Sequence, residues 1–174
     1  MKHLNIRLVR ETEIEQLQLI SIKTFEETFI DHCAPTDLSD FLKSAYSYEK
    51  LKTEFQNEES IFYFAEYGTK IVGYLKLNWG KAQTESLEEN ALELERIYLL
   101  AEYQGKQIGQ FLVDNAMQIA KNKKFKTIWL GVWENNLRAI SFYKKNGFEQ
   151  FSSHIFPLGN DMQTDILMKK TILD

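Results

Sequence analysis

Residue types that mark special classes of protein are scarce in this sequence. Among its 174 residues are one cysteine, two prolines and eight glycines. The lone Cys33 excludes an internal disulfide and a site built from several thiolates, and it favours a reducing, cytoplasmic setting. The low proline and glycine content excludes collagen-like and low-complexity chains. With 44% hydrophobic and 26% charged residues, the composition is typical of a soluble globular protein.

Long hydrophobic runs and an excess of positive charge are also absent. Every apolar stretch is far shorter than the roughly 20 residues that a membrane helix requires. The start, MKHLNIRLVRETEIE, carries charges where a signal peptide needs an apolar core, so we expect neither export nor membrane insertion. There are 21 Lys and Arg against 25 Asp and Glu, and the net charge of -4 favours cationic partners over nucleic acid.

Two hydrophobic periods alternate along the chain, and no linker or repeat divides it, so we expect a single domain over residues 1–174. Helical spacing, with a capping box formed by Thr12 and Glu15 at the first start, predicts four helices within residues 12–29, 47–55, 107–120 and 135–145. Alternating or β-branched runs predict strands at residues 4–9, 61–67, 70–79, 92–100, 127–133, 148–156 and 162–169. This order predicts an α+β fold with a single, mainly antiparallel mixed sheet of about seven strands. Residues 30–47 are expected to be loop plus a short helix.

The first segment with a chemical signature runs from Leu94 to Gly109. A predicted strand leads there through the turn Tyr103-Gln104-Gly105-Lys106-Gln107-Ile108-Gly109 into a helix N-terminus. Such a turn presents unpaired backbone N–H groups and the positive end of the helix dipole, which together bind a phosphate or pyrophosphate. The glycines are equally compatible with a simple turn and close packing, so both interpretations stay open on this segment alone.

The second segment contains N-x-x-A-x-x-F-Y-x-x-x-G-F from Asn136 to Phe148. In this order and separation, the two segments resemble the GCN5-related N-acetyltransferase (GNAT) superfamily, whose members transfer acetyl from acetyl-CoA to an amine. The resemblance spans about residues 60–170. The segment LELERIYL and the region from Phe25 to Tyr48 are most similar to bacterial spermidine/spermine N-acetyltransferases.

The resemblance implies where acetyl-CoA binds. Backbone groups of one strand would pair with the pantetheine arm, the turn would hold the pyrophosphate, and the N-x-x-A helix would complete the site. The residues so assigned are Ile97, Tyr98, Leu99, Gln104, Gly105, Lys106, Gln107, Ile108, Gly109, Asn136, Tyr143 and Lys145. Gln107 departs from the family pattern Q/R-x-x-G-x-G/A, because a glycine is usual there. An ordinary helical conformation at Gln107 would still leave its N–H available.

Acetyl transfer to an amine also makes chemical demands on the site. An alkylammonium group, with an ordinary pKa near 10.4, must lose a proton before it attacks a thioester, and the leaving thiolate benefits from a proton donor. Tyr143 is the expected acid and Glu93 or Glu95 the expected base. The two glutamates share a face of a regular strand unless a bulge intervenes. A salt bridge with Arg96 is an equal alternative for each glutamate, and a core position is the alternative for Tyr143.

The acidic residues favour a polyamine acceptor such as spermidine or spermine. The resemblance implies that the N-terminal region with Asp31, Asp37 and Asp40 borders the acceptor cleft, and Glu85, Glu88 and Glu89 add carboxylates close in sequence to Glu93 and Glu95. Carboxylates around a cleft attract a multiply charged amine, although acidic loops that only maintain solubility are the alternative.

The predicted enzyme transfers acetyl directly to a primary amine in a ternary complex, without a metal. A homodimer is compatible with this prediction. A protein N-terminus or another small amine as acceptor, and a catalytically weak acyl-CoA-binding regulator, are the alternatives.

Overall fold

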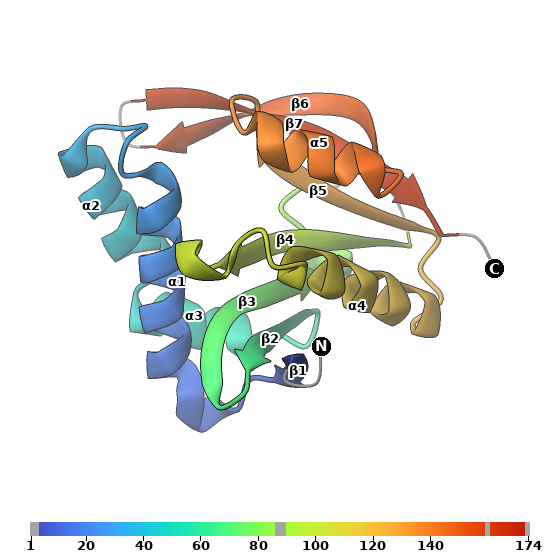
Figure 1. The fold of residues 1–174 in the computed structure, drawn as a ribbon, viewed down its shortest axis with the longest axis horizontal. Coiled ribbons are helices and arrows are strands. Elements are labelled where there is room, and N and C mark those ends of the chain that lie inside the picture. Colours follow the sequence, from blue (N-terminus) through green and yellow to red (C-terminus); the bar gives the residue numbers. More distant parts are fainter. Residues whose placement is uncertain (1–3, 86–89, 159–160, 173–174) are drawn as a thin grey trace.

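The computed structural model describes residues 4–85, 90–158 and 161–172, which form a twisted sheet with helices on both faces (Figure 1). The strands are β1 (Leu4–Leu8), β2 (Ser60–Tyr67), β3 (Lys70–Asn78), β4 (Ala91–Leu99), β5 (Thr127–Trp133), β6 (Glu149–Leu158) and β7 (Asp161–Thr171). The helices are α1 (Ile14–Phe29), α2 (Pro35–Ala45), α3 (Tyr48–Phe55), α4 (Ile108–Asn122) and α5 (Leu137–Lys145). No helix in the described ranges is long and apolar enough to cross a membrane.

The seven strands lie in the order β1-β2-β3-β4-β5-β7-β6. Every neighbouring pair is antiparallel except β4 and β5, which are parallel. The predicted mixed, mainly antiparallel sheet is therefore confirmed. The described residues contain the four helices predicted by helical spacing and a fifth, α2, which is the short helix expected within residues 30–47 and has Pro35 in its first turn.

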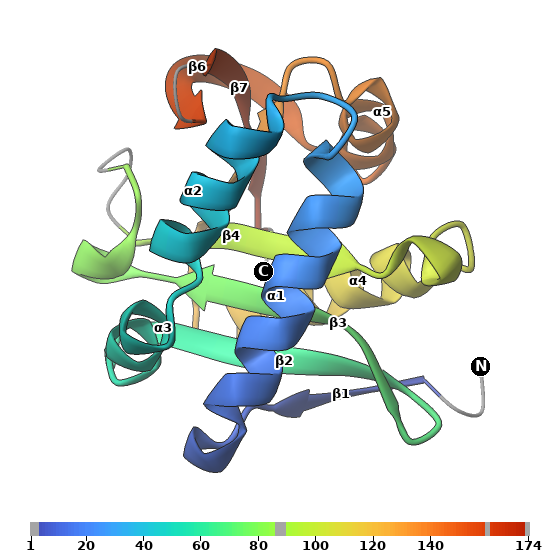
Figure 2. The same cartoon turned by 90° about the vertical axis from the view of Figure 1, so that its left-hand side faces the viewer.

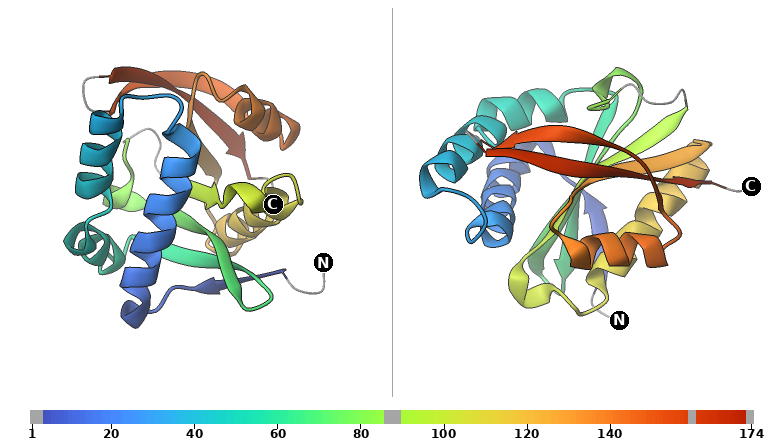
Figure 3. Two further views of the ribbon diagram at one scale, coloured as in Figure 1. Left: turned by 60° about the vertical axis from the view of Figure 1, so that its left-hand side comes forward. Right: turned by 90° about the horizontal axis from the view of Figure 1, so that it is seen from above.

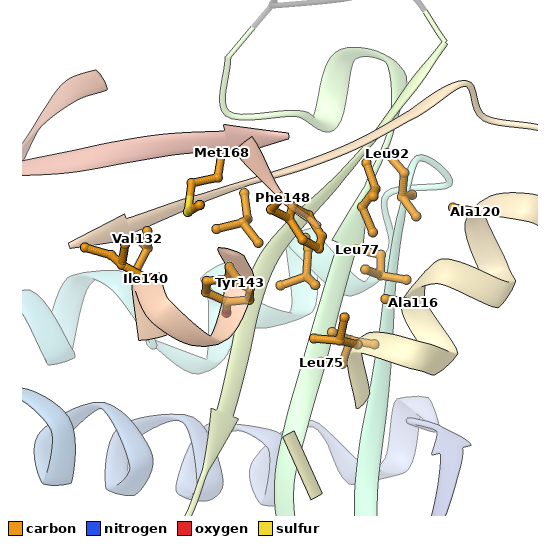
Figure 4. Packing of buried hydrophobic residues seen from close by; sticks show 14 residues of the cluster. Leu75, Leu77, Leu92, Ala116, Ala120, Val132, Ile140, Tyr143, Phe148 and Met168 are labelled. Atoms are coloured by element: carbon orange, nitrogen blue, oxygen red, sulfur yellow. The ribbon is translucent and has the colours of Figure 1, made fainter. Parts of the chain in front are cut away.

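The helices form two layers that sandwich the sheet. Figure 2 shows α1, α2 and α3 in front of one face, while α4 and α5 cover the other. Alternate strand residues supply the two cores: Tyr74 belongs to the α1 side and its neighbour Leu75 to the side of α4 and α5. Figure 4 shows this second core, where Leu75 and Leu77 face Ala116 of α4.

The start of α1 differs from the sequence prediction. The Thr12–Glu15 capping box is wrong: residues 11–13 form a short 3-10 turn and α1 begins at Ile14. Glu13 rather than Glu15 accepts the backbone N–H of Arg10 at 3.0 Å, and its other oxygen accepts from Arg7 at 2.9 Å. An ion pair with β1 therefore fixes where the helix begins.

Two irregularities in β4 shape the centre of the sheet. Lys76 of β3 pairs with Arg96 while Leu77 pairs with Leu94, so Glu95 is an extra, bulged residue. On its other side, β4 pairs with β5 only at residues 91–93, and the strands then diverge (Figure 1). The β6–β7 hairpin reaches across the opening toward α2 (Figure 3), where Phe156 packs edge-on to Phe41 with ring centroids 5.5 Å apart.

Candidate active site

A cleft of about 1250 Å³ opens where β4 and β5 separate. Its walls come from the free edge of β4, the end of β5, the start of α4, the inner side of α5, and residues of α1 and the β6–β7 hairpin. Within the described parts of the chain, the β5-facing edge of β4 has no strand partner beyond Glu93. Its backbone N–H and C=O groups are therefore available to a ligand with amide groups of its own.

Most residues assigned to acetyl-CoA line this cleft. They are Ile97, Tyr98, Leu99, Gln104, Gly105, Gln107, Gly109, Asn136 and Tyr143. The side chain of Ile108 instead packs in the core, 2% exposed, with Leu112. Lys106 points its ammonium over the ring of Tyr103, 5.1 Å from the centroid, and does not line the cleft.

Gln107 is left-handed rather than helical, which corrects the sequence expectation. It has φ 63° and ψ 8° and stands at the N-cap of α4, without a side-chain capping hydrogen bond. This is the backbone conformation for which glycine is favoured, and a side chain in it costs about 1–2 kcal/mol. The turn therefore has the backbone conformation that a glycine would favour at this position, although the residue is Gln107.

The positive charge at this turn comes from Arg138 rather than Lys145. Lys145 is exposed in the last turn of α5 and does not line the cleft. Arg138, in the first turn of α5, lines the cleft and points a guanidinium nitrogen at Gln104 Oε1, 3.5 Å away. Its place two residues after the helix cap Asn136 is the signal that sequence reasoning missed.

Asn136 is the N-cap of α5, because its side-chain oxygen accepts a hydrogen bond from the N–H of Ala139 at 3.1 Å. This cap fixes the position of Asn136 at the start of α5. Asn136 lines the cleft, and its side-chain NH₂ group can donate hydrogen bonds there.

Tyr143 lies where α5 meets the cleft. Its ring packs edge-on against Phe148, with centroids 5.7 Å apart, and Figure 4 shows it among the core residues. The residue is 7% exposed and still lines the cleft. Burial raises the pKa of its hydroxyl, so the group stays protonated at neutral pH and can donate a proton. The core role and the expected acid role are thus compatible.

Glu93 and Glu95 lie close enough to share Asn78 as a partner, and the bulge at Glu95 brings it beside Arg96, which contacts Glu54 of α3. One amide nitrogen of Asn78 donates to both carboxylates, at 2.9 Å to Glu93 and 2.5 Å to Glu95. Thr84 donates to both oxygens of Glu93: its backbone N–H donates to Oε2, which Asn78 also binds, at 2.9 Å, and its hydroxyl donates to Oε1.

The surroundings of the two glutamates shift their pKa values in opposite directions. Burial raises the pKa of Glu93, and the nearby charge of Glu95 raises it further. Burial acts the same way on Glu95, but Arg96 and Lys76 outweigh it and lower its pKa to about 2. Glu93 is therefore the better proton acceptor.

Glu95 belongs to a buried ion cluster that ties α3 to the sheet. Lys76 lies 2.5 Å from Glu95 and 3.0 Å from Glu54 of α3. Arg96 donates two hydrogen bonds to Glu54, at 2.9 and 3.0 Å, and also contacts Glu95 at 3.0 Å. The salt-bridge alternative raised for each glutamate thus describes Glu95.

The three aspartates expected at the acceptor cleft do not line it. Asp31 follows α1 in an exposed turn, Asp37 lies in the first turn of α2, and Asp40 pairs with Lys43 at 3.6 Å on the outer side of α2. Glu88 and Glu89 lie outside the described residues.

Glu85, which the sequence indicated among the further carboxylates, does line the cleft, and so does Asp165, which it did not indicate. The ring of His154 lies between them, with its nitrogens 2.9 Å from Glu85 and 3.7 Å from Asp165. Burial raises the pKa of Asp165, and the neighbouring His154 opposes that shift. Asp165 enters the cleft because β7 pairs with β5, a long-range register that local sequence reasoning missed.

Comparison with known proteins gives consistent matches over this architecture. The model of the acetyltransferase (GNAT) family matches residues 21–148. An uncharacterized N-acetyltransferase from the pepI 3' region of Lactobacillus delbrueckii subsp. lactis is 38% identical over 99% of this chain and 100% of its own length. A spermidine N(1)-acetyltransferase of Thermoplasma acidophilum is 28% identical over 84% of this chain and 88% of its own. The crystal structure of the PaiA N-acetyltransferase of that organism, in complex with coenzyme A, matches with a TM-score of 0.77 and 27% identity, covering 97% of this chain and 98% of that one.

Proposed function

Because this chain belongs to the GNAT acetyltransferase family, and is thus an N-acetyltransferase with acetyl-CoA as donor, we propose that its acceptor is a polyamine. The observation that carries the proposal is a cleft that joins the turn from Gln104 to Gly109, the buried Tyr143, and an acidic wall formed by Glu85 and Asp165. We further propose that Tyr143 is the general acid and Glu93 the general base.

The residues of the cleft fit acetyl-CoA. The unpaired edge of β4 at Ile97–Leu99 would bind the amide groups of the pantetheine arm. Gly105, with φ 75°, and Gly109 bring backbone N–H groups to the start of α4, where the helix dipole favours the pyrophosphate. Arg138 adds a guanidinium that can hold a phosphate oxygen.

Acetyl-CoA supplies an activated acetyl group as a thioester. The protein supplies proton transfer on both sides of that group. Glu93 takes up a proton from the acceptor ammonium and so frees the nitrogen lone pair, while the Tyr143 hydroxyl holds the proton that a leaving thiolate needs. The raised pKa of Glu93 suits a base, because Glu93 then binds a proton nearer neutrality, whereas burial of Tyr143 only keeps its hydroxyl protonated.

The acidic wall supports a polyamine as acceptor. Glu85 and Asp165 line the same cleft as Glu93, and Glu85 follows Thr84, which binds Glu93. An acceptor with several ammonium groups can place one at Glu93 while another interacts with these carboxylates. The net charge of -4 and the relative named spermidine N(1)-acetyltransferase support the same class of acceptor.

Two isosteric substitutions at Gly109 test the donor site. A side-chain carbon at Gly109 would meet only the Phe142 ring, 3.8 Å away, so the site has room for either residue. Gly109→Asp places a negative charge against the expected pyrophosphate and should abolish acetyl-CoA binding in calorimetry, whereas Gly109→Asn should weaken it much less. Equal affinity in both variants would show that no phosphate lies at this turn.

A further inference from the structure

The connection between β3 and β4 is fastened to the acceptor end of the cleft by three consecutive residues. Gln83 accepts the indole N–H of Trp129 at 2.8 Å, Thr84 binds Glu93, and Glu85 contacts His154. These contacts reach three different strands, β5, β4 and β6. The Thr84 hydroxyl is thereby held on the Glu93 carboxylate at the wall of the cleft.

Glu93, the proposed base, is much less exposed than its neighbour Thr84. Glu93 is only 2% exposed, whereas Thr84 is an exposed residue. An acceptor ammonium that enters the cleft therefore meets the Thr84 hydroxyl more readily than the carboxylate behind it.

Only one of the described partners of Glu93 can pass a proton on. The backbone N–H of Thr84 and the amide nitrogen of Asn78 donate hydrogen bonds and cannot accept a proton. The amide oxygen of Asn78 is taken by the Ser60 hydroxyl at 2.9 Å. A hydroxyl has a donor hydrogen together with acceptor lone pairs, so the Thr84 side chain can do both.

We propose that Thr84 is a catalytic proton relay between the acceptor ammonium and Glu93. The ammonium N–H bond breaks as its proton forms a bond to Thr84 Oγ1, while the original Oγ1–H proton passes to Glu93 Oε1. Thr84 is unchanged overall, Glu93 becomes a carboxylic acid, and the amine becomes a neutral nucleophile. The inference rests on the proposed function, in which Glu93 is the base.

The buried environment of Glu93 supports the direction of this transfer. Desolvation disfavours the carboxylate and raises the pKa of Glu93. The proton relayed from Thr84 therefore arrives at a group that accepts it more readily than an exposed glutamate would.

The test compares Thr84→Val with Thr84→Ser. Valine keeps the shape and the backbone N–H bond to Glu93 but lacks the hydroxyl, whereas serine keeps the hydroxyl. With acetyl-CoA and spermidine at pH 7, we expect Thr84→Val to lower kcat by about 10²-fold and Thr84→Ser to keep most of it. Thermal unfolding of each variant checks the fold, and Thr84→Ala replaces the valine variant if valine disturbs it.

The pH dependence separates a relay from a structural role. Free amine increases as pH approaches the amine pKa of about 10.4, and a neutral acceptor needs no relay. The factor by which Thr84→Val lowers kcat relative to the wild type should therefore shrink steadily as pH rises. A deficit that is equal at every pH, or no deficit at all, overturns the relay.

Failure of the proposed base has a different signature. If Glu93→Gln keeps the wild-type kcat, both the base and the relay are wrong. If Glu93→Gln is inactive while Thr84→Val is fully active, only the relay is wrong.

Discussion

Replacing Gln107 by glycine should stabilise the enzyme and improve its donor site together. Gln107 has φ 63° and lacks a capping hydrogen bond from its side chain. Relief of left-handed strain contributes about 1–2 kcal/mol, and the greater chain entropy of unfolded glycine offsets roughly 0.5–1 kcal/mol. The mid-values leave a net gain of about 0.75 kcal/mol within a range of about 0–1.5 kcal/mol, which should raise the Tm by about 1–3 °C for a chain of this size. Without a side chain, the turn also admits the pyrophosphate more closely, so calorimetry should give a lower Kd for acetyl-CoA.

Lys124 provides the matched control for Gln107→Gly. It has φ 61°, is exposed, and lies at the end of α4 away from the cleft. Lys124→Gly should therefore raise the Tm by a similar amount and leave acetyl-CoA affinity unchanged. A Gln107→Gly variant that is less stable than the wild type would refute the strain argument. An equal gain in acetyl-CoA affinity in Gln107→Gly and Lys124→Gly would refute the argument that the Gln107 side chain holds the pyrophosphate away from the turn.

Three further outcomes follow from the site. Tyr143→Phe should keep the fold and the acetyl-CoA affinity while lowering kcat by about 10²-fold; a loss confined to KM would indicate positioning instead. Glu95→Gln should cost about 3–5 kcal/mol in urea unfolding at pH 7, because Lys76 and Arg96 lose a buried partner. Since the folded pKa of Glu95 is about 2, below that of an unfolded glutamate, its stabilisation is present above the unfolded value near 4.3 and is lost as pH falls toward 2. Added salt should lower kcat/KM for spermidine more steeply than for a monoamine, and equal slopes would count against the acidic wall.

The fold was largely predictable because hydrophobic periods and turn residues are local signals. Gly68, with φ 64°, lies in the gap between the predicted strands 61–67 and 70–79, and Ser47, at the start of the predicted helix 47–55, caps α3 through the N–H of Lys50. The start of α1 was not predictable, since it depends on an ion pair between Arg7 and Glu13. The left-handed Gln107 was also missed, because a residue that is not glycine gives no sign of that conformation.

The candidate site was predictable where a motif carries its residues. Tyr143 and the turn from Gln104 to Gly109 belong to such motifs, and most of these residues line the cleft. Of the two carboxylates of the acidic wall, Glu85 was named from the sequence and lines the cleft, whereas Asp165 was not predictable, because it reaches the cleft through the pairing of β7 with β5. Which of the two glutamates is the better proton acceptor was likewise not predictable, because it depends on which one Lys76 and Arg96 contact, a feature of tertiary packing.

The most direct test of the central claim is product formation from acetyl-CoA and spermidine, followed by mass spectrometry together with the release of free coenzyme A thiol. The account predicts N-acetylspermidine in a one-to-one ratio with released thiol, and strong loss of both in Tyr143→Phe. Tight binding of acetyl-CoA without an acetylated product from spermidine, spermine or any other amine would contradict it and indicate a binding protein rather than an enzyme.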